Sequence, residues 1–156
     1  RSLSMSVILA TLAGLSAAPP ASGEENLARH GWSGEGAASL VYGVAESDHV
    51  LLSLSCEQGS QIRLVYPYEP KTARDGGTYD LTLKVGKQVL SMKTTGARLD
   101  MDDLFILEGD LPKGTNLVSL LTGGKTLTVG VNHDVSDLPL VGAATAASAL
   151  LEICGR

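Results

Sequence analysis

Apolar and polar residues alternate at a spacing of two over much of this chain, and that alternation is what most constrains its fold. In residues 52–56, serines separate Leu52, Leu54 and Cys56, and residues 79–85 show the same pattern. Because successive side chains of a strand point to opposite faces, such runs predict strands with one buried face. Turn residues separate the runs, so the chain is expected to fold as a succession of short strands.

The strands expected from these runs are residues 40–44, 49–56, 61–66, 79–85, 89–94, 104–107 and 126–131. Gly86-Lys87 is predicted to be a two-residue hairpin turn, because glycine at the first position permits the positive φ that such turns need. The prolines around Tyr68 cannot supply the backbone N–H of a central strand, so residues 67–77 are expected to form a loop.

Two segments have helical spacing instead. Residues 116–122 follow a possible N-cap and precede two glycines, and residues 143–153 form an Ala- and Leu-rich stretch with Ala147, Leu150, Leu151 and Cys154 on one stripe. The expected class is therefore α+β. It is mainly antiparallel β, as a sandwich-like fold or a meander sheet, with one short helix and a C-terminal helix.

The first 23 residues are predicted to be a signal peptide. The uncharged apolar run 7–18 is shorter than the about 20 residues that span a bilayer, and the small residues 21–23 offer a cleavage site. The alternative is a buried helix at the start of a cytosolic domain. We expect a periplasmic or secreted protein without a stable membrane anchor after cleavage. Residues 24–38 are then a flexible Gly/Ser-rich lead, and residues 39–156 form a single β-rich domain.

The two cysteines, Cys56 and Cys154, are far apart in the sequence and belong to no Cys-x-x-Cys pair. In an exported protein this arrangement favours a structural disulfide. Cys56 ends a predicted strand face, and Cys154 ends the apolar stripe of the predicted last helix. Both sulfurs are therefore expected on buried faces, although two buried free thiols remain the alternative.

Several classes of function find little support. A formal net charge of −5 without a basic run argues against nucleic-acid partners. Gly123-Gly124-Lys125-Thr126 lacks the first glycine of a phosphate-binding loop, and Gly31-Trp32-Ser33-Gly34 lacks the second glycine of a nucleophile elbow. The acidic cluster at residues 100–110 lacks calcium-loop spacing and is interpreted as a solvated turn. We therefore predict no cofactor and no metal site.

Histidines and tyrosines supply the remaining candidates. His30, His49 and His133 could act as bases, and His49 and His133 each have an aspartate beside them. A catalytic triad, however, is a spatial arrangement that sequence neighbours do not establish. Tyr66 and Tyr68 are a possible binding surface, because binding residues concentrate on loops over a rigid sheet. The alternative is that both rings cover the end of the core.

The C-terminal third resembles a known family. Residues 117–129, LVSLLTGGKTLTV, followed by LPLVGAA at 138–144 and an Ala/Leu helix, resemble exported proteobacterial proteins of the invasion-associated locus B type. The resemblance covers residues 117–154. It implies an exported β-rich fold and brings no catalytic residues with it.

The leading hypothesis is an exported, non-enzymatic domain that binds an unknown protein or envelope component. The alternatives are a periplasmic hydrolase with dispersed catalytic residues and an inhibitor of envelope proteases. A hydrolase should have a pocket where His49 or His133 meets a carboxylate and a nucleophile, whereas a binding module should have a filled core and an exposed patch.

Overall fold

A computed structural model describes residues 27–44, 48–57 and 60–154. The predicted signal peptide, residues 1–23, lies outside the described residues. The fold is mostly antiparallel β with short helices, including one at the C-terminal end, so the predicted class is confirmed. Within the described part of the chain, no helix is long and apolar enough to cross a membrane.

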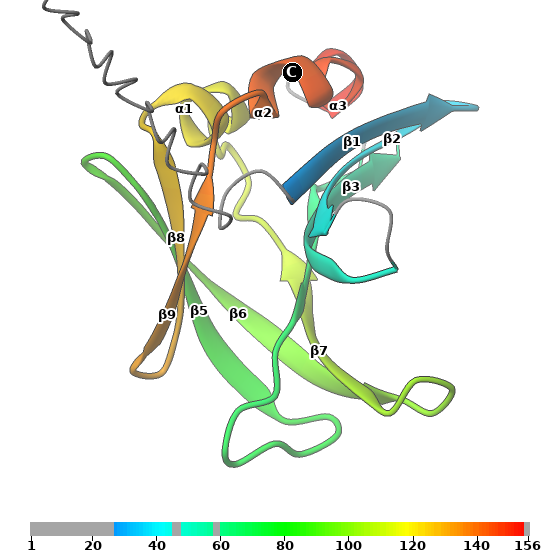
Figure 1. The fold of residues 1–156 in the computed structure, drawn as a ribbon, viewed down its shortest axis with the longest axis vertical. Coiled ribbons are helices and arrows are strands. Elements are labelled where there is room, and N and C mark those ends of the chain that lie inside the picture. The colour runs from blue at the N-terminus through cyan, green and yellow to red at the C-terminus, as the bar shows by residue number, and fades with distance from the viewer. Residues whose placement is uncertain (1–26, 45–47, 58–59, 155–156) are drawn as a thin grey trace, which may run out of the picture.

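One curled sheet contains all the strands (Figure 1). They are β1 (Leu27–Gly34), β2 (Ala37–Val44), β3 (Val50–Glu57), β4 (Arg63–Pro67), β5 (Thr78–Val85), β6 (Gln88–Leu99), β7 (Leu104–Asp110), β8 (Thr126–Val131) and β9 (Asp134–Pro139). Their order in the sheet is β1-β2-β3-β4-β7-β6-β5-β8-β9, and neighbouring strands are antiparallel. Strands that follow each other in the sequence are also neighbours in the sheet, except that β5 does not pair with β4 and β8 does not pair with β7.

The helices gather at one end of the sheet (Figure 1). They are α1 (Leu117–Thr122), α2 (Ala143–Ala146) and α3 (Ser148–Cys154). Asn116 caps α1, since its side-chain oxygen accepts a hydrogen bond from the backbone N–H of Ser119 at 3.0 Å. The predicted helix over 143–153 is divided in two at Ala147, whose side chain is buried.

The inner face of the curl is the core, and it follows the predicted alternation. Along β5, every second residue from Tyr79 to Val85 is buried while those between are exposed. The largest fully enclosed side chains come from β2, β3, β4, β5, β7 and α1: Leu40, Tyr42, Leu52, Leu54, Leu64, Leu81, Leu83, Phe105, Leu107, Leu117 and Leu120. Each such side chain contributes about 1.5–3 kcal/mol to folding by leaving water. The predicted Gly86-Lys87 turn is present, since Val85 pairs with Gln88.

The structure differs from the sequence expectations at both edges of the described sheet. β1 occupies most of the predicted flexible lead 24–38, because it pairs along its whole length with β2 through the two-residue turn Glu35-Gly36, both with positive φ. β9 was not expected, because its first four residues are exposed and show no alternation. Pairing with β8, rather than an apolar pattern, makes this segment a strand.

Candidate functional site

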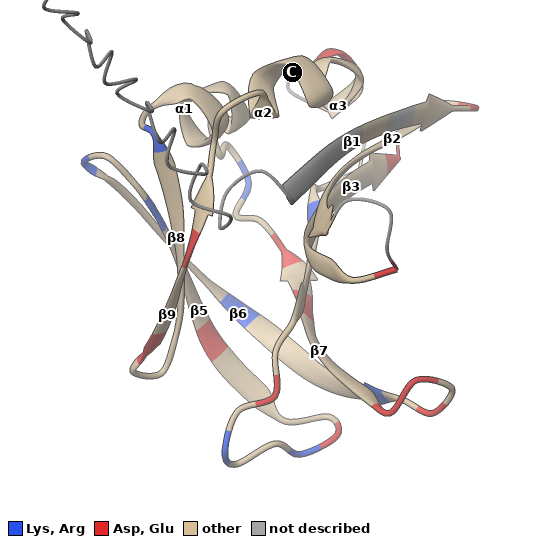
Figure 2. Cartoon of the chain, in the orientation of Figure 1, with Lys and Arg blue, Asp and Glu red and all other residues tan. Residues whose placement is uncertain are grey.

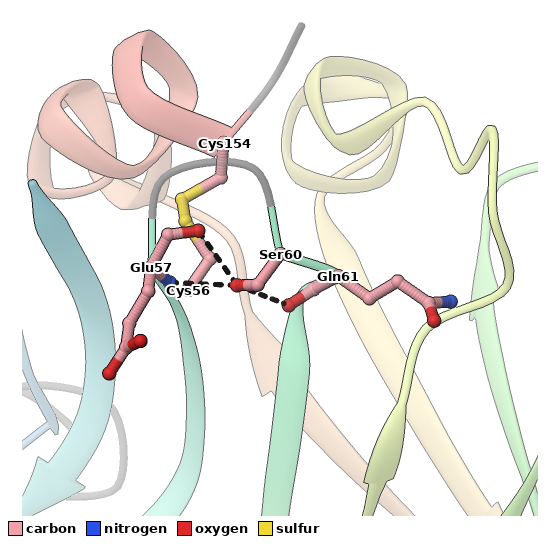
Figure 3. The surroundings of a disulfide bond; sticks show 5 residues. All are labelled: Cys56, Glu57, Ser60, Gln61 and Cys154. Carbon is pink, nitrogen blue, oxygen red and sulfur yellow. Dashed lines mark hydrogen bonds between the residues drawn. A yellow bond between two sulfur atoms is a disulfide. The ribbon is translucent and has the colours of Figure 1, made fainter.

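The helical end of the molecule is closed by a disulfide (Figure 3). It joins Cys56 near the end of β3 to Cys154, the last residue of α3, with a Cα–Cα distance of 6.2 Å. This distance lies within the usual range of about 4.4–6.8 Å for disulfides. The predicted disulfide is therefore present and ties the last helix to the sheet. Cys56 is buried as expected, whereas Cys154 is only partly buried.

Two hollows flank this disulfide. One, of about 530 Å³, lies between Cys154 and the segment 111–116. The other, of about 460 Å³, lies where the start of β2, the end of β3 and the start of β4 meet. Ser60 lines both, but its hydroxyl is already engaged (Figure 3): it accepts from the backbone N–H of Glu57 at 2.9 Å and donates to the Glu57 carbonyl at 2.7 Å. No histidine occurs among the described residues that line the two hollows.

Two of the histidines considered for catalysis lie at exposed positions beside strands. His49 immediately precedes β3, His133 lies in the β8–β9 turn, and both are exposed. The side chain of His30 lies outside what the structure describes. Within the described ranges there is no group of three or more His, Cys, Asp or Glu side chains able to hold a metal ion. Neither His49 nor His133 lines either of the two hollows described above.

Tyr66 and Tyr68 stack on each other with ring centroids 5.7 Å apart and ring planes 11° apart. Tyr66 is only 7% exposed and belongs to the core. The Tyr68 hydroxyl donates a hydrogen bond to the carboxylate of Asp134, which raises the pKa of Tyr68 to about 12. The pair therefore joins the chain after β4 to the start of β9, and little of Tyr66 is accessible for the predicted recognition role.

A different element exposes apolar side chains. Between β6 and β7 the chain turns through residues 99–104, the hairpin tip, which projects from the end of the molecule opposite the helices (Figure 1). Met101 is 97% exposed, and Leu99 and Leu104 are each 40% exposed. Leu99 and Leu104 pair across the ladder, so their side chains lie on the same face of the hairpin. Together with Met101 in the turn between them, they are called the apolar cluster below. Such a cluster is unfavourable in water, which makes the hairpin tip a candidate contact surface.

Arg98 braces the base of the hairpin tip. Its guanidinium pairs with Glu69 and Asp103, with 2.9 Å between Nη1 and the Asp103 carboxylate, and lies 5.4 Å from the Phe105 ring centroid. The Arg98 backbone N–H donates to Asp75 at 3.0 Å. The hydrogen bond to Glu69, followed by that to Asp103, raises the pKa of Arg98. The contacts with Glu69 and Asp75 join the tip to the loop between β4 and β5.

The brace also fixes the backbone of the turn. Asp103 has a φ of 48°, a left-handed conformation that non-glycine residues rarely adopt. Nη1 of Arg98 donates to both the carbonyl and the carboxylate of this residue, at 3.3 and 2.9 Å. The segment is therefore an exposed acidic turn, as the sequence predicted, and Arg98 holds Asp103 within it.

The sequence pattern indicated the acidic cluster of this segment but not its exposed apolar residues. The sequence feature that could have indicated an exposed apolar residue is Asp100-Met101-Asp102-Asp103, flanked by two leucines. A large apolar side chain lies there among acidic residues at a turn. Figure 2 shows acidic residues gathered at this projecting end, with a basic residue just before them on β6.

Comparisons of the chain with models of known protein families, with curated proteins and with solved structures found no match.

Proposed function

We propose that this chain is an exported, non-enzymatic domain that binds another protein through its hairpin tip. The observation that carries the proposal is the exposed cluster of Leu99, Met101 and Leu104 on a braced projection. Methionine is common at protein-binding surfaces because its unbranched thioether side chain adapts to a partner. Bracing lowers the conformational entropy that the tip loses on binding.

Three features support export: the predicted signal peptide, the disulfide between Cys56 and Cys154, and the resemblance of residues 117–154 to exported proteins. We expect the exported product to begin near Glu24. The intact mass of the protein recovered outside the cytoplasm measures this directly, and a product that retains residues 1–23 would contradict export with cleavage.

The binding function is tested by site-specific photo-cross-linking of the full chain in living cells. A photoreactive amino acid replaces Met101 in one variant and Val89 in the control. Val89 is also exposed, at 61% against 97% for Met101, and lies near the other end of β6, so it is an exposed apolar position away from the tip. We expect a discrete protein adduct from position 101 and none from position 89. Absence of an adduct at position 101, or equal adducts at both positions, would refute the proposal.

Inhibition of an envelope protease is a second candidate, because a braced, projecting segment is the kind of element that can occupy a protease cleft. Incubation of the exported protein with a panel of purified proteases separates the two. An inhibitor slows one of them at equimolar concentration and loses this effect in Met101→Asp, whereas a binding domain of another kind leaves all of them unaffected.

A further inference from the structure

The charges around the hairpin tip indicate which partner surface it fits. Asp100, Asp102 and Asp103 are all exposed, and Glu69 lies at the base of the tip. Arg98 neutralises part of this charge through its pairs with Glu69 and Asp103. Asp100 and Asp102 form no ion pair with any described residue, so the tip carries excess negative charge around its apolar cluster.

The size of the tip indicates the shape of that surface. Stable protein interfaces bury about 1,200–2,000 Å² in total. A turn of six residues pressed against a flat surface buries far less, whereas a concave surface encloses the apolar side chains on several sides. Met101 is almost fully exposed at the apex, so it is the side chain best placed to enter a recess.

We propose that the partner presents an apolar socket bordered by lysine or arginine side chains, into which Met101 inserts while Asp100 and Asp102 face the basic border. This inference rests on the proposed function and specifies its partner. Opposite charges around an apolar contact favour association and discourage partners of the wrong charge. Negatively charged lipid headgroups would be repelled by the same aspartates, so the charges favour a protein over an anionic membrane.

Charge reversal next to the photoreactive position tests the socket. In the full chain with the cross-linker at position 101, the double variant Asp100→Lys/Asp102→Lys should lower the adduct yield at least tenfold. The double variant Asp100→Asn/Asp102→Asn should give an intermediate yield. The matched control, Asp48→Lys/Glu152→Lys, changes the net charge equally at exposed positions outside the tip and should keep the yield within twofold.

Two further readouts make the outcomes distinct. Peptide mapping of the adduct should place the cross-link in an apolar recess with neighbouring Lys or Arg residues. Sedimentation with phosphatidylcholine vesicles, with and without phosphatidylglycerol, should show no association that depends on Met101. If the adduct yield does not change on charge reversal, the proposed socket is refuted, whereas the proposed function is not. Vesicle binding that depends on Met101 would show that the tip binds lipid instead. If the variant with the cross-linker at position 101 and no other change gives no adduct, both proposals are refuted.

Discussion

The two ends of this molecule are held together by different interactions. At the helical end, α3 packs against the sheet through fully buried Leu150 and is bonded to β3 through Cys56–Cys154. At the opposite end, exposed polar groups brace the chain: Arg98 with its acidic partners, and Tyr68 with Asp134. Burial and covalent closure contribute far more free energy than exposed ion pairs do. The helical end is therefore expected to contribute most of the free energy of unfolding. The opposite end contributes less, so exposed apolar residues can lie there at little cost in stability.

The largest effect should follow from removal of the disulfide. It closes a loop with a sequence separation of 98 residues, for which chain entropy predicts about 4.7 kcal/mol of stabilisation. The double variant Cys56→Ala/Cys154→Ala should lower the free energy of unfolding by about 2–5 kcal/mol in urea titrations. Addition of a thiol reductant should destabilise the parent protein similarly and leave the variant unchanged. A loss below about 1 kcal/mol would show that α3 is held by packing alone.

Truncation of one apolar residue at each end compares the two regions directly. Leu150→Ala should cost about 2–5 kcal/mol, because it removes a side chain with 0% exposure and leaves a cavity. Met101→Ala should change the unfolding free energy by less than about 0.5 kcal/mol, because that side chain is 97% exposed. Chemical denaturation of both variants measures the contrast. A cost at position 101 as large as that at position 150 would show that the tip packs against other parts of the chain.

The base of the β6–β7 hairpin is tightly packed around Gly96, although the tip of the same hairpin is exposed. A Cβ atom at Gly96 would lie 2.5 Å from Cζ of Phe105 and 2.8 Å from Cε2 of Tyr79. Gly96→Ala should therefore cost about 1–3 kcal/mol by overpacking. Thr95→Ala, at an exposed position on the same strand, serves as the control and should remain within about 0.5 kcal/mol of the parent.

The smallest effect should come from the bond between Tyr68 and Asp134. Tyr68→Phe should lower the unfolding free energy by about 1 kcal/mol at neutral pH. Because the folded-state pKa is raised to about 12, this contribution is complete below about pH 10 and is lost as the pH rises through 12. In ultraviolet titrations, the tyrosine step near pH 12 should be absent from Tyr68→Phe and should move to lower pH in Asp134→Asn. A step unchanged by Asp134→Asn would contradict the assigned cause.

Period-two alternation was sufficient to predict most of the sheet, because its strands bury one face. The alternation did not predict strands that depend on pairing or packing with another segment of the chain. β6 continues past the predicted end at Thr94, because Gly96 gives Phe105 and Tyr79 room to approach rather than interrupting the strand. β9 has an exposed, polar start and is defined by its pairing with β8.

For the candidate site, the sequence identified the acidic turn at residues 100–103 but not its role. Composition alone describes this segment as a solvated loop. The exposed cluster emerges only when Leu99 is paired with Leu104 and when Arg98 bonds to Glu69, which is remote in sequence. Conversely, the tyrosines at positions 66 and 68 looked like a binding surface until packing placed the first in the core.

The sequence by itself determined most of the strands, the short helix after Asn116 and the pairing of Cys56 with Cys154, because each of these follows from a local period or a local cap. Only the tertiary structure decided that β1 completes the sheet, that Gly31 lets α2 approach, and that Met101 projects into solvent. A Cβ at Gly31 would collide with the carbonyl oxygen of Ala146, so this glycine, although it looks like part of a linker, permits a close contact. Contacts between residues distant in the chain leave no local period, and only folding brings them together.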